Sequence, residues 1–430
     1  MNVKLLRNRN FALLVLGRFI SNIGSAMQNF AFSLYVLKLT GSGSHFASIL
    51  AVGMIPSLIL GPICGVFADW FNRKKIIVYL DFISGVLIGS MFLISISVGL
   101  TTYHIYITVI LLSVISSLFN PAMSAALPSV VEKDELLEAN SISSLLSTVS
   151  GLISPVLAGM VFGFYGISVV MFINSLSFIL SGISELFIEM KETPDKIRSF
   201  SIASFKNDFS KGIKFIYNKS IIRKLILCGL IMNLTLNPTF TIGIPYIAKM
   251  VLKVSDLHLG MLQTIAFIGT ILGPIMAGVV SKKISLNKIF CFATLTTGLL
   301  IGYMSLNSTD VYISLFNSNL VPYISFAIAA LMISAVITIM NISFFTLIQK
   351  EVPLEMMGRV NSVIGTTVMG AIPLGQILFG YMFDKVAGYL PLMISSIVIT
   401  IISLTFTYSI RETRDYKEDI LDAGEFDSIE

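Results

Sequence analysis

Short polar clusters divide the chain into twelve apolar segments, each long enough to cross a lipid bilayer as a helix. The segments begin near Phe11, His45, Ile76, His104, Leu137, Ile167, Leu225, Leu257, Ile289, Val321, Val360 and Tyr389. A spanning helix needs about 20 apolar residues, whereas a barrel strand is an alternating segment of about 10. Lipid offers no water to satisfy backbone groups. The segments therefore predict an all-α membrane protein with twelve transmembrane helices.

The composition argues against a water-soluble surface. Of the 430 residues, 55% are hydrophobic and 12% are charged, against about 25% charged in an ordinary soluble domain. We therefore expect the lipid bilayer to surround the chain, and we expect no nucleic-acid partner. The three cysteines and three histidines are scattered singly. This pattern favours neither a disulfide framework nor a metal site, and we expect no cofactor.

The basic residues are distributed asymmetrically about the twelve segments. If the N-terminus is cytoplasmic, four of the 29 Lys and Arg residues lie outside, Arg18 lies within a segment, and the remaining 24 are cytoplasmic. The four outside are Lys38, Lys249, Lys253 and Lys385. Because cytoplasmic loops carry the excess of positive charge, the pattern predicts a multi-pass protein of the bacterial inner membrane with both termini cytoplasmic.

A basic stretch in the middle of the chain separates six segments from six. We expect an N-terminal six-helix bundle over residues 1–190, a cytoplasmic linker over 191–220, a C-terminal bundle over 221–411 and an acidic cytoplasmic tail over 412–430. Apolar residues recur at helical spacing among lysines in the linker, which predicts an amphipathic helix at the anionic leaflet. A solvated linker is the alternative. Asn140–Ser141 recurs as Asn361–Ser362, which favours two pseudo-symmetric bundles.

The turn after the second segment carries a spaced set of residues: Gly65, Asp69, Arg73 and Lys74. A glycine permits close approach of helices, the acid can face a helix N-terminus, and Asn72 tolerates a left-handed turn. This set resembles the loop between helices 2 and 3 of the major facilitator superfamily, although Trp70 and Asn72 depart from its commonest pattern. The resemblance implies a conformational motif in a major facilitator fold. The alternative is a purely topological role, in which the basic residues only hold this loop on the cytoplasmic side of the membrane.

A second signature follows the fourth segment, with Asn120 and Pro121, then Pro128, then Glu138 and Asn140. It resembles the drug-efflux branch of the superfamily that contains bacterial macrolide efflux proteins and a siderophore exporter. The resemblance implies a secondary active exporter of small amphipathic compounds that works by alternating access. The membrane-embedded arginine that many other branches carry in helix 4 is missing, so coupling schemes that use it do not transfer.

Polar side chains form stripes along four of the segments. Spacings of three and four residues place Arg18, Asn22, Ser25 and Asn29 on one helix face, which is unsuited to lipid. In the superfamily the corresponding helices line the central cavity. We assign to a candidate substrate cavity the residues Arg18, Asn22, Ser25, Asn29, Ser117, Asn120, Asn233, Asn237, Thr338 and Asn341. Hydrogen bonding between helices within a bundle is the alternative.

The fifth segment contains small residues around a proline, which allow helices to approach closely and bend: Gly151, Ser154, Pro155 and Gly159. We interpret them as a helix-packing motif, with an ordinary proline kink as the alternative. Two acids, Asp81 and Glu185, lie within segments and are the candidates for proton coupling. Ion pairing with Arg73 or with linker lysines is the alternative role.

Motifs of other energy sources and of hydrolases are missing. The chain has no Gly-x-x-x-x-Gly-Lys-Ser/Thr loop, no His-Glu-x-x-His and no Gly-x-Ser-x-Gly. We therefore expect no enzyme, but a monomeric efflux transporter for a small amphipathic substrate, coupled to protons by antiport. A siderophore or metabolite exporter of the same fold, and a non-transporting receptor or assembly factor, remain the alternatives.

Overall fold

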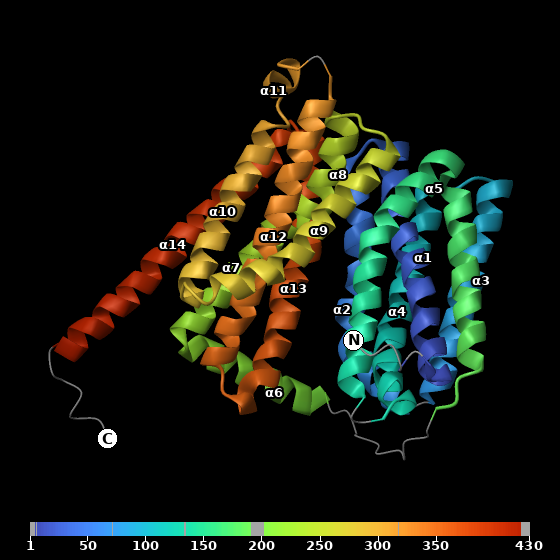
Figure 1. Ribbon diagram of the computed structural model, residues 1–430, viewed down its shortest axis with the longest axis horizontal. Helices are drawn as coiled ribbons and strands as arrows, with labels where there is room; N and C mark the ends of the chain where they lie inside the picture. Colours follow the sequence, from blue (N-terminus) through green and yellow to red (C-terminus); the bar gives the residue numbers. More distant parts are fainter. Residues whose placement is uncertain are drawn as a thin grey trace. The chain divides into compact units, whose positions relative to one another are not determined.

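The computed structural model describes residue 5 and residues 7–70, 72–132, 135–190, 202–316 and 318–422, and within these it contains helices and no strand. The helices are drawn in Figure 1. Their bounds are α1 Arg9–Thr40, α2 Gly43–Trp70, α3 Arg73–Ser97, α4 Thr102–Val130, α5 Leu136–Leu186, α6 Ile202–Asn218, α7 Ser220–Pro238, η2 Thr239–Gly243, α8 Ile244–Tyr246, η3 Ile247–Val251, α9 Asp256–Val280, α10 Leu286–Leu306, α11 Asp310–Ser314, α12 Leu320–Glu351, α13 Leu354–Lys385 and α14 Tyr389–Asp422.

The predicted twelve spans correspond to these helices once α5 is divided. Among the described residues, eleven helical stretches are long and apolar enough to cross a membrane, and one of them covers Glu138–Leu186. That stretch of 49 residues is interrupted at Gly166, whose φ of 80° and ψ of −177° are not helical. A glycine adopts such angles without a Cβ clash. Spans five and six are therefore two helices joined at Gly166, and the all-α membrane fold is confirmed.

The seventh span is less regular than its sequence predicts. It contains two π-helical turns, η2 and η3, on either side of the short helix α8. Pro245 lies in α8 and cannot donate the backbone hydrogen bond that an α-helix requires there. Such π-helical turns inside helices occur frequently at functional sites, and η2 carries Phe240, which lines a pocket described below.

Two compact units make up the chain, and each is described by itself. Unit 1 comprises Met1–Lys206, Ala248–Thr264 and Gln376–Lys385, and unit 2 comprises Asn207–Ile247, Ile265–Gly375 and Val386–Glu430. The first turns of α9 and the last turns of α13 therefore group with α1–α5. Because these bounds differ from those of the predicted bundles, the division at residues 190 and 221 stays a prediction.

In unit 1, α1 and α3 pack against α5, and α2 packs against α4. A Cβ placed on Gly17 would lie 2.5 Å from the Ser184 hydroxyl, and one on Gly24 would clash with Asn174. Glycine thus permits the backbone of α1 to approach the second half of α5. At the end where α1 begins, a buried apolar cluster joins α1, α3, α4 and α5, with Phe11, Ile77, Ala122 and Ala139 fully buried.

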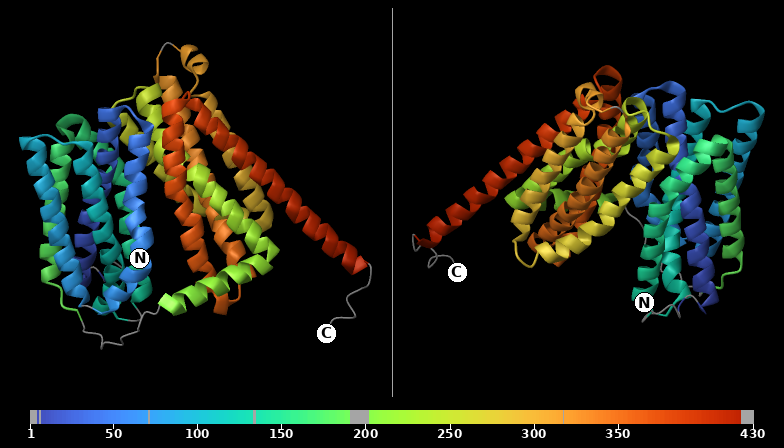
Figure 2. Two further views of the ribbon diagram at one scale, coloured as in Figure 1. Left: turned by 180° about the vertical axis from the view of Figure 1, so that it is seen from behind. Right: turned by 45° about the horizontal axis from the view of Figure 1, so that its top comes forward.

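In unit 2, α10 packs against both α12 and α14. Close approach is again possible at a glycine, because a Cβ on Gly298 would lie 2.5 Å from the Thr400 hydroxyl. Helix α14 continues to Asp422, past the predicted end of the last span at 411. Between 411 and 422 there is neither glycine nor proline to end the helix. Both views of Figure 2 show its last turns extending beyond the other helices of this unit.

Candidate functional site

Two carboxyl side chains are buried together in unit 1. Asp81 of α3 is 2% exposed and Glu185, near the end of α5, is 0% exposed. The two interact electrostatically with one another. Among the described residues, neither carboxyl oxygen of Glu185 has a hydrogen-bond partner, and one oxygen of Asp81 also lacks one. An unpartnered buried carboxylate is costly, and ionisable residues in this position mark ion or proton pathways in membrane proteins.

Arg18 is the cation that lies beside this acid pair. Its neighbour Gly17 packs against Ser184, the neighbour of Glu185, so the close approach of α1 and α5 brings Arg18 and Glu185 into electrostatic interaction. The ion pairs within 4.0 Å in the described part of the chain do not include Arg18. The guanidinium therefore interacts with Glu185 at longer range, without a direct salt bridge.

Arg18 also lines a pocket of about 400 Å³ in unit 1. Residues from α1, α4 and α5 form its walls, and the side chains are mostly serine, asparagine and aliphatic. They are Leu14, Val15, Arg18, Phe19, Asn22, Met123, Ser124, Leu127, Asn140, Ser143, Ser144, Leu146 and Ser147. Arg18 is the one charged side chain among them, so it dominates the electrostatic potential of this pocket.

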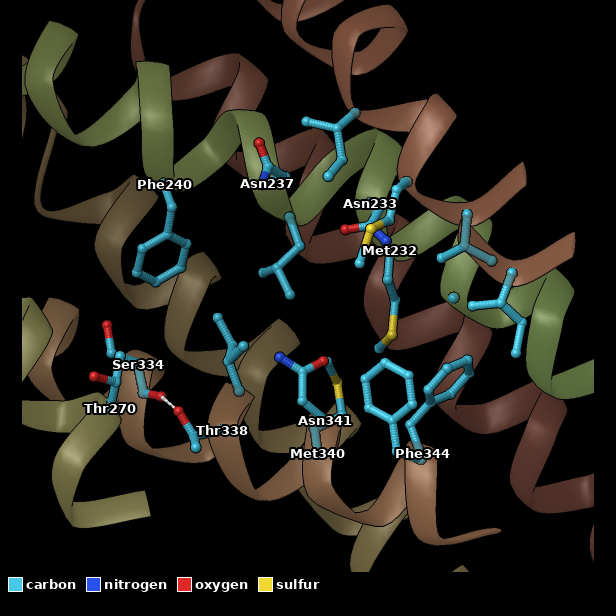
Figure 3. Close-up of a pocket in the computed structure, with 18 of the residues that line it drawn as sticks. Met232, Asn233, Asn237, Phe240, Thr270, Ser334, Thr338, Met340, Asn341 and Phe344 are labelled. Atoms are coloured by element: carbon cyan, nitrogen blue, oxygen red, sulfur yellow. Dashed lines mark hydrogen bonds between the residues drawn. The ribbon is translucent and has the colours of Figure 1, made fainter. Parts of the chain in front are cut away.

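A second pocket, also of about 400 Å³, lies in unit 2. Figure 3 shows Asn233 and Asn237 of α7 on one side of it, with Asn341 and Phe344 of α12 opposite. Its lining contains no charged residue and combines amide and hydroxyl groups with phenylalanine and methionine side chains. The lining includes Met232, Asn233, Asn237, Phe240, Thr270, Ser334, Thr338, Met340, Asn341, Phe344, Phe345 and Met369.

The predicted cavity residues divide between these pockets and the helix packing. Arg18 and Asn22 line the pocket of unit 1, and all four residues predicted on α7 and α12 line the pocket of unit 2. Ser25, Asn29, Ser117 and Asn120 line neither pocket. Ser117 is 7% exposed and donates a 2.7 Å hydrogen bond to the Ser113 carbonyl of its own helix. For these four residues a place in the substrate cavity stays a prediction.

The loop between α2 and α3 places its basic residues against neighbouring helices. Arg73 donates to the Ala125 carbonyl at 3.4 Å, and Lys74 donates to the Leu186 carbonyl at 2.8 Å. Asn72 has extended angles (φ −60°, ψ 111°) and caps α3 by accepting from the Lys75 amide. Asn72 does not use the left-handed conformation that asparagine tolerates, because its side-chain oxygen satisfies a free helix amide in the extended conformation. The surroundings of Gly65 and the side chain of Asp69 lie outside what the structure describes.

Small residues of the fifth span contact the first turns of α9. A Cβ on Gly159 would lie 2.5 Å from the Asp256 carbonyl, and one on Gly260 would clash with the Pro155 carbonyl. Ser154 is fully buried, and its hydroxyl has no hydrogen-bond partner in the described part of the chain. Close approach of helices at this point requires a residue without a side chain, as the small-residue pattern around Pro155 allows. Whether Gly151 and Ser154 contribute in the same way stays a prediction.

Sequence reasoning missed an ion-pair cluster at this contact. Asp256 accepts from Lys38 at 2.5 Å and from Lys249 at 2.7 Å, and its side chain is 9% exposed. Asp384, near the end of α13, accepts from the Gly43 amide at 2.6 Å and so caps the N-terminus of α2. The charge count had marked Lys38 and Lys249 as outside residues, but it gave no indication of their partner.

The many apolar helices and the glycine contacts between them define a polytopic membrane protein with a pocket in each unit. The model of the Major Facilitator Superfamily matches residues 14–376. The chain therefore belongs to this superfamily, and it is a transporter rather than an enzyme.

Named relatives and solved structures agree with this assignment. Macrolide efflux protein A of Streptococcus pyogenes is 22% identical over 378 residues, which cover 86% of this chain and 88% of that protein. The protein of the same name from Enterococcus faecalis is 21% identical over 336 residues, which cover 76% of this chain and 98% of that protein. The structure of a bacterial homologue of the iron transporter ferroportin in the inward-facing state has a TM-score of 0.70, with 16% identity over 94% of this chain and 99% of that chain. The structure of the nucleoside transporter NupG has a TM-score of 0.73, with 12% identity over 95% of this chain and 99% of that chain. At these identities the structures show the fold alone.

Proposed function

We propose that the protein exports small amphipathic compounds, macrolide-like or other drugs, across the bacterial cell membrane by proton antiport. The observation that carries the proposal is the buried acid pair beside an arginine that lines a pocket. Asp81 and Glu185 offer a place for a proton, and Arg18 connects that place to a space open to a ligand. The names of the macrolide efflux relatives support export.

The unit 2 pocket supports an amphipathic substrate. Its phenylalanine and methionine side chains suit apolar and aromatic surfaces, while Asn233 and Asn341 offer both donors and acceptors. Sugars and phosphates call for many fixed polar or basic groups, and the described lining of this pocket has no base. We further propose a monomer with cytoplasmic termini, in which Gly65, Asp69, Arg73 and Lys74 bias the equilibrium between conformations.

The test is drug susceptibility and drug accumulation in a pump-deficient host, with and without this chain. Export predicts that expression lowers accumulation of at least one macrolide or other amphipathic drug, and that a protonophore removes the effect. Unchanged accumulation of every such drug, together with export of a siderophore or metabolite, would replace the proposed substrate class.

Coupling is tested in reconstituted vesicles by recording substrate-induced proton movement. Asp81→Asn, more than Glu185→Gln, is expected to abolish gradient-driven efflux while leaving substrate binding and downhill exchange intact. A purely structural role predicts instead a loss of abundance without uncoupling. Wild-type coupling in both variants, singly and together, would contradict the proposed proton site.

A further inference from the structure

The electrostatic potential in the unit 1 pocket depends on two buried acids that are not part of its lining. Arg18 lines the pocket, and it interacts with Glu185 of α5, which in turn interacts with Asp81 of α3. With both acids ionised, the three side chains together carry one negative charge. With both acids protonated, they carry one positive charge, and it resides on the residue that faces the ligand. Burial reduces the solvent screening that would otherwise weaken this change.

Other charged groups near the cluster are held by different partners. On α3, Lys74 donates to the Leu186 carbonyl and Arg73 donates to the Ala125 carbonyl of α4. The exception is Glu138 at the start of α5, which has one buried carboxyl oxygen without a hydrogen-bond partner in the described residues but does not line the pocket. The pocket residues contributed by α4 are uncharged. Arg18 is therefore the charged side chain of the pocket lining, and it interacts with the buried acid Glu185.

We propose that the proton occupancy of the Asp81–Glu185 pair decides whether the positive charge of Arg18 is compensated in the unit 1 pocket, and that the exported substrate is a cationic amphiphile expelled when the pair is protonated. This inference rests on the proposed proton antiport and names the substrate charge that such antiport requires. Protonation removes the negative charges that compensate Arg18, so the arginine then repels a cation in the pocket. Proton and cation consequently exclude one another.

The sign of this linkage selects the substrate class. Mutual exclusion of proton and substrate is the condition for antiport, and by reciprocity a bound cation favours release of the protons. An anionic substrate would behave in the opposite way, because it would compete with ionised Glu185 for Arg18 and bind best when the acids carry protons. Proton and anion would then move together. The aromatic faces of the unit 2 pocket are compatible with a cation, since phenylalanine rings attract positive charge.

The pocket charge can be measured without transport. Ser144 lines the pocket and is exposed, so Ser144→Cys is prepared in a background with Cys64, Cys228 and Cys291 changed to serine, and the protein is placed in nanodiscs. The thiol is treated with a sulfonatoethyl or a trimethylammonioethyl methanethiosulfonate. Both reagents react with the same thiolate, so its ionised fraction cancels in the ratio of the two rate constants. The ratio therefore reports the local electrostatic potential.

The anionic-to-cationic rate ratio is expected to rise by roughly tenfold between about pH 8.5 and about pH 5. The double variant Asp81→Asn, Glu185→Gln is expected to keep the high ratio at every pH. Arg18→Gln is expected to lower the ratio at every pH, because it removes one positive charge in both protonation states of the acids. In Lys74→Gln the rate ratio should still rise as the pH falls. For a thiol from Asn341→Cys in the unit 2 pocket, the ratio should not change with pH. A pH-independent ratio at Ser144→Cys, or unchanged titration in the double variant, overturns the proposal.

Substrate charge is tested with two ions of the same shape, tetraphenylphosphonium and tetraphenylborate. At high pH the phosphonium is expected to slow the labelling of Ser144→Cys by N-ethylmaleimide. At low pH this protection should disappear. The borate should do the opposite. Protection by the borate alone at every pH contradicts a cationic substrate. Labelling needs no transport. If the drug-accumulation assay fails while these labelling results hold, the exporter function is rejected, but the proposed effect of the acids on the pocket charge is retained.

Discussion

The Lys38 ammonium at the end of α1 donates a 2.5 Å hydrogen bond to Asp256, the first residue of α9, which lies 218 positions further along the chain. Lys249 donates to the other carboxyl oxygen at 2.7 Å and also to the Val254 carbonyl at 2.9 Å. Lys38 further lies over the Phe162 ring at 4.6 Å. One buried carboxylate thus joins three segments of unit 1: α1, η3 and α9.

Removing this carboxylate should destabilise the protein more than removing either lysine. Asp256→Ala leaves Lys38 and Lys249 unpaired, and we expect a loss of roughly 3 kcal/mol. Lys38 has a side chain that is 45% exposed, so Lys38→Ala should cost less than about 1 kcal/mol. Thermal unfolding in detergent measures both. The matched control is Lys253→Asn, at a residue with a φ of 53° that asparagine tolerates. A loss in Asp256→Ala no larger than about 1 kcal/mol, as expected for Lys38→Ala, would show that the cluster contributes little.

Helix contact at Gly159 should tolerate no side chain. A Cβ there would lie 2.5 Å from the Asp256 carbonyl, and overpacking of this kind costs about 1 to 3 kcal/mol. Gly159→Ala is therefore expected to lower the thermal stability and the yield of folded protein. Gly163→Ala is the control on α5, since its Cβ would make ordinary contact at 3.4 Å, and Gly278→Ala is the control on α9, where nothing lies within 4 Å. The idea fails if all three variants unfold at the same temperature.

The sequence predicted the parts of this fold that depend on local pattern. Apolar runs of sufficient length gave the twelve spans, and helical spacing brought Asn233, Asn237, Thr338 and Asn341 to one pocket. The same reasoning does not tell which face of α4 meets a pocket, because the rotation of α4 is set by its packing against α2 and α3.

Other features depend on distant residues or on small departures from helical geometry. No local signal joins Lys38 to Asp256, and the Arg18–Glu185 interaction follows from the close approach at Gly17 and Ser184. The π-helical turns around Pro245 belong to a seventh span that reads as an ordinary helix. Pairings between segments far apart in the chain become visible only when the helices are packed.

The basic loop between α2 and α3 should affect transport more than abundance. Arg73→Ala removes the hydrogen bond to the Ala125 carbonyl. Asp69→Asn removes a negative charge that the amide does not replace. We expect a loss of about tenfold in the efflux rate normalised to protein level, the equivalent of about 1.4 kcal/mol between two conformations. Lys75→Ala is the control. Near wild-type normalised rates in both Asp69→Asn and Arg73→Ala would return the loop to a topological anchor.

The orientation in the membrane can be tested at the two ends of α10. Ser281 and Ser314 are both exposed, and the distribution of basic residues predicts Ser281 on the cytoplasmic side and Ser314 outside. In the background without native cysteines, Ser314→Cys should react with an impermeant maleimide in intact cells, whereas Ser281→Cys should react only after permeabilisation. The reverse pattern would overturn the predicted cytoplasmic termini.

The unit 2 pocket should determine affinity for the substrate through its amides and its exposed ring. Asn233→Ala and Asn341→Ala each remove a group able to hydrogen-bond a ligand, worth about 1 kcal/mol when unreplaced. Phe345 lines the pocket with 43% of its surface exposed and packs edge to face on Phe344, so Phe345→Ala should weaken binding of the apolar part of a substrate. Each change is expected to raise the concentration for half-maximal efflux by roughly fivefold.

Protein level and melting temperature should remain near the wild-type values in these three variants, because none of them removes a fully buried side chain. The matched control is Ile342→Ala, at a residue of α12 that is 38% exposed and does not line the pocket. Efflux kinetics in vesicles, normalised to the amount of transporter, provide the measurement. If Ile342→Ala changes the half-maximal concentration as much as Asn341→Ala does, the effect arises from α12 as a whole. The amide groups would then have no specific role in recognising the substrate.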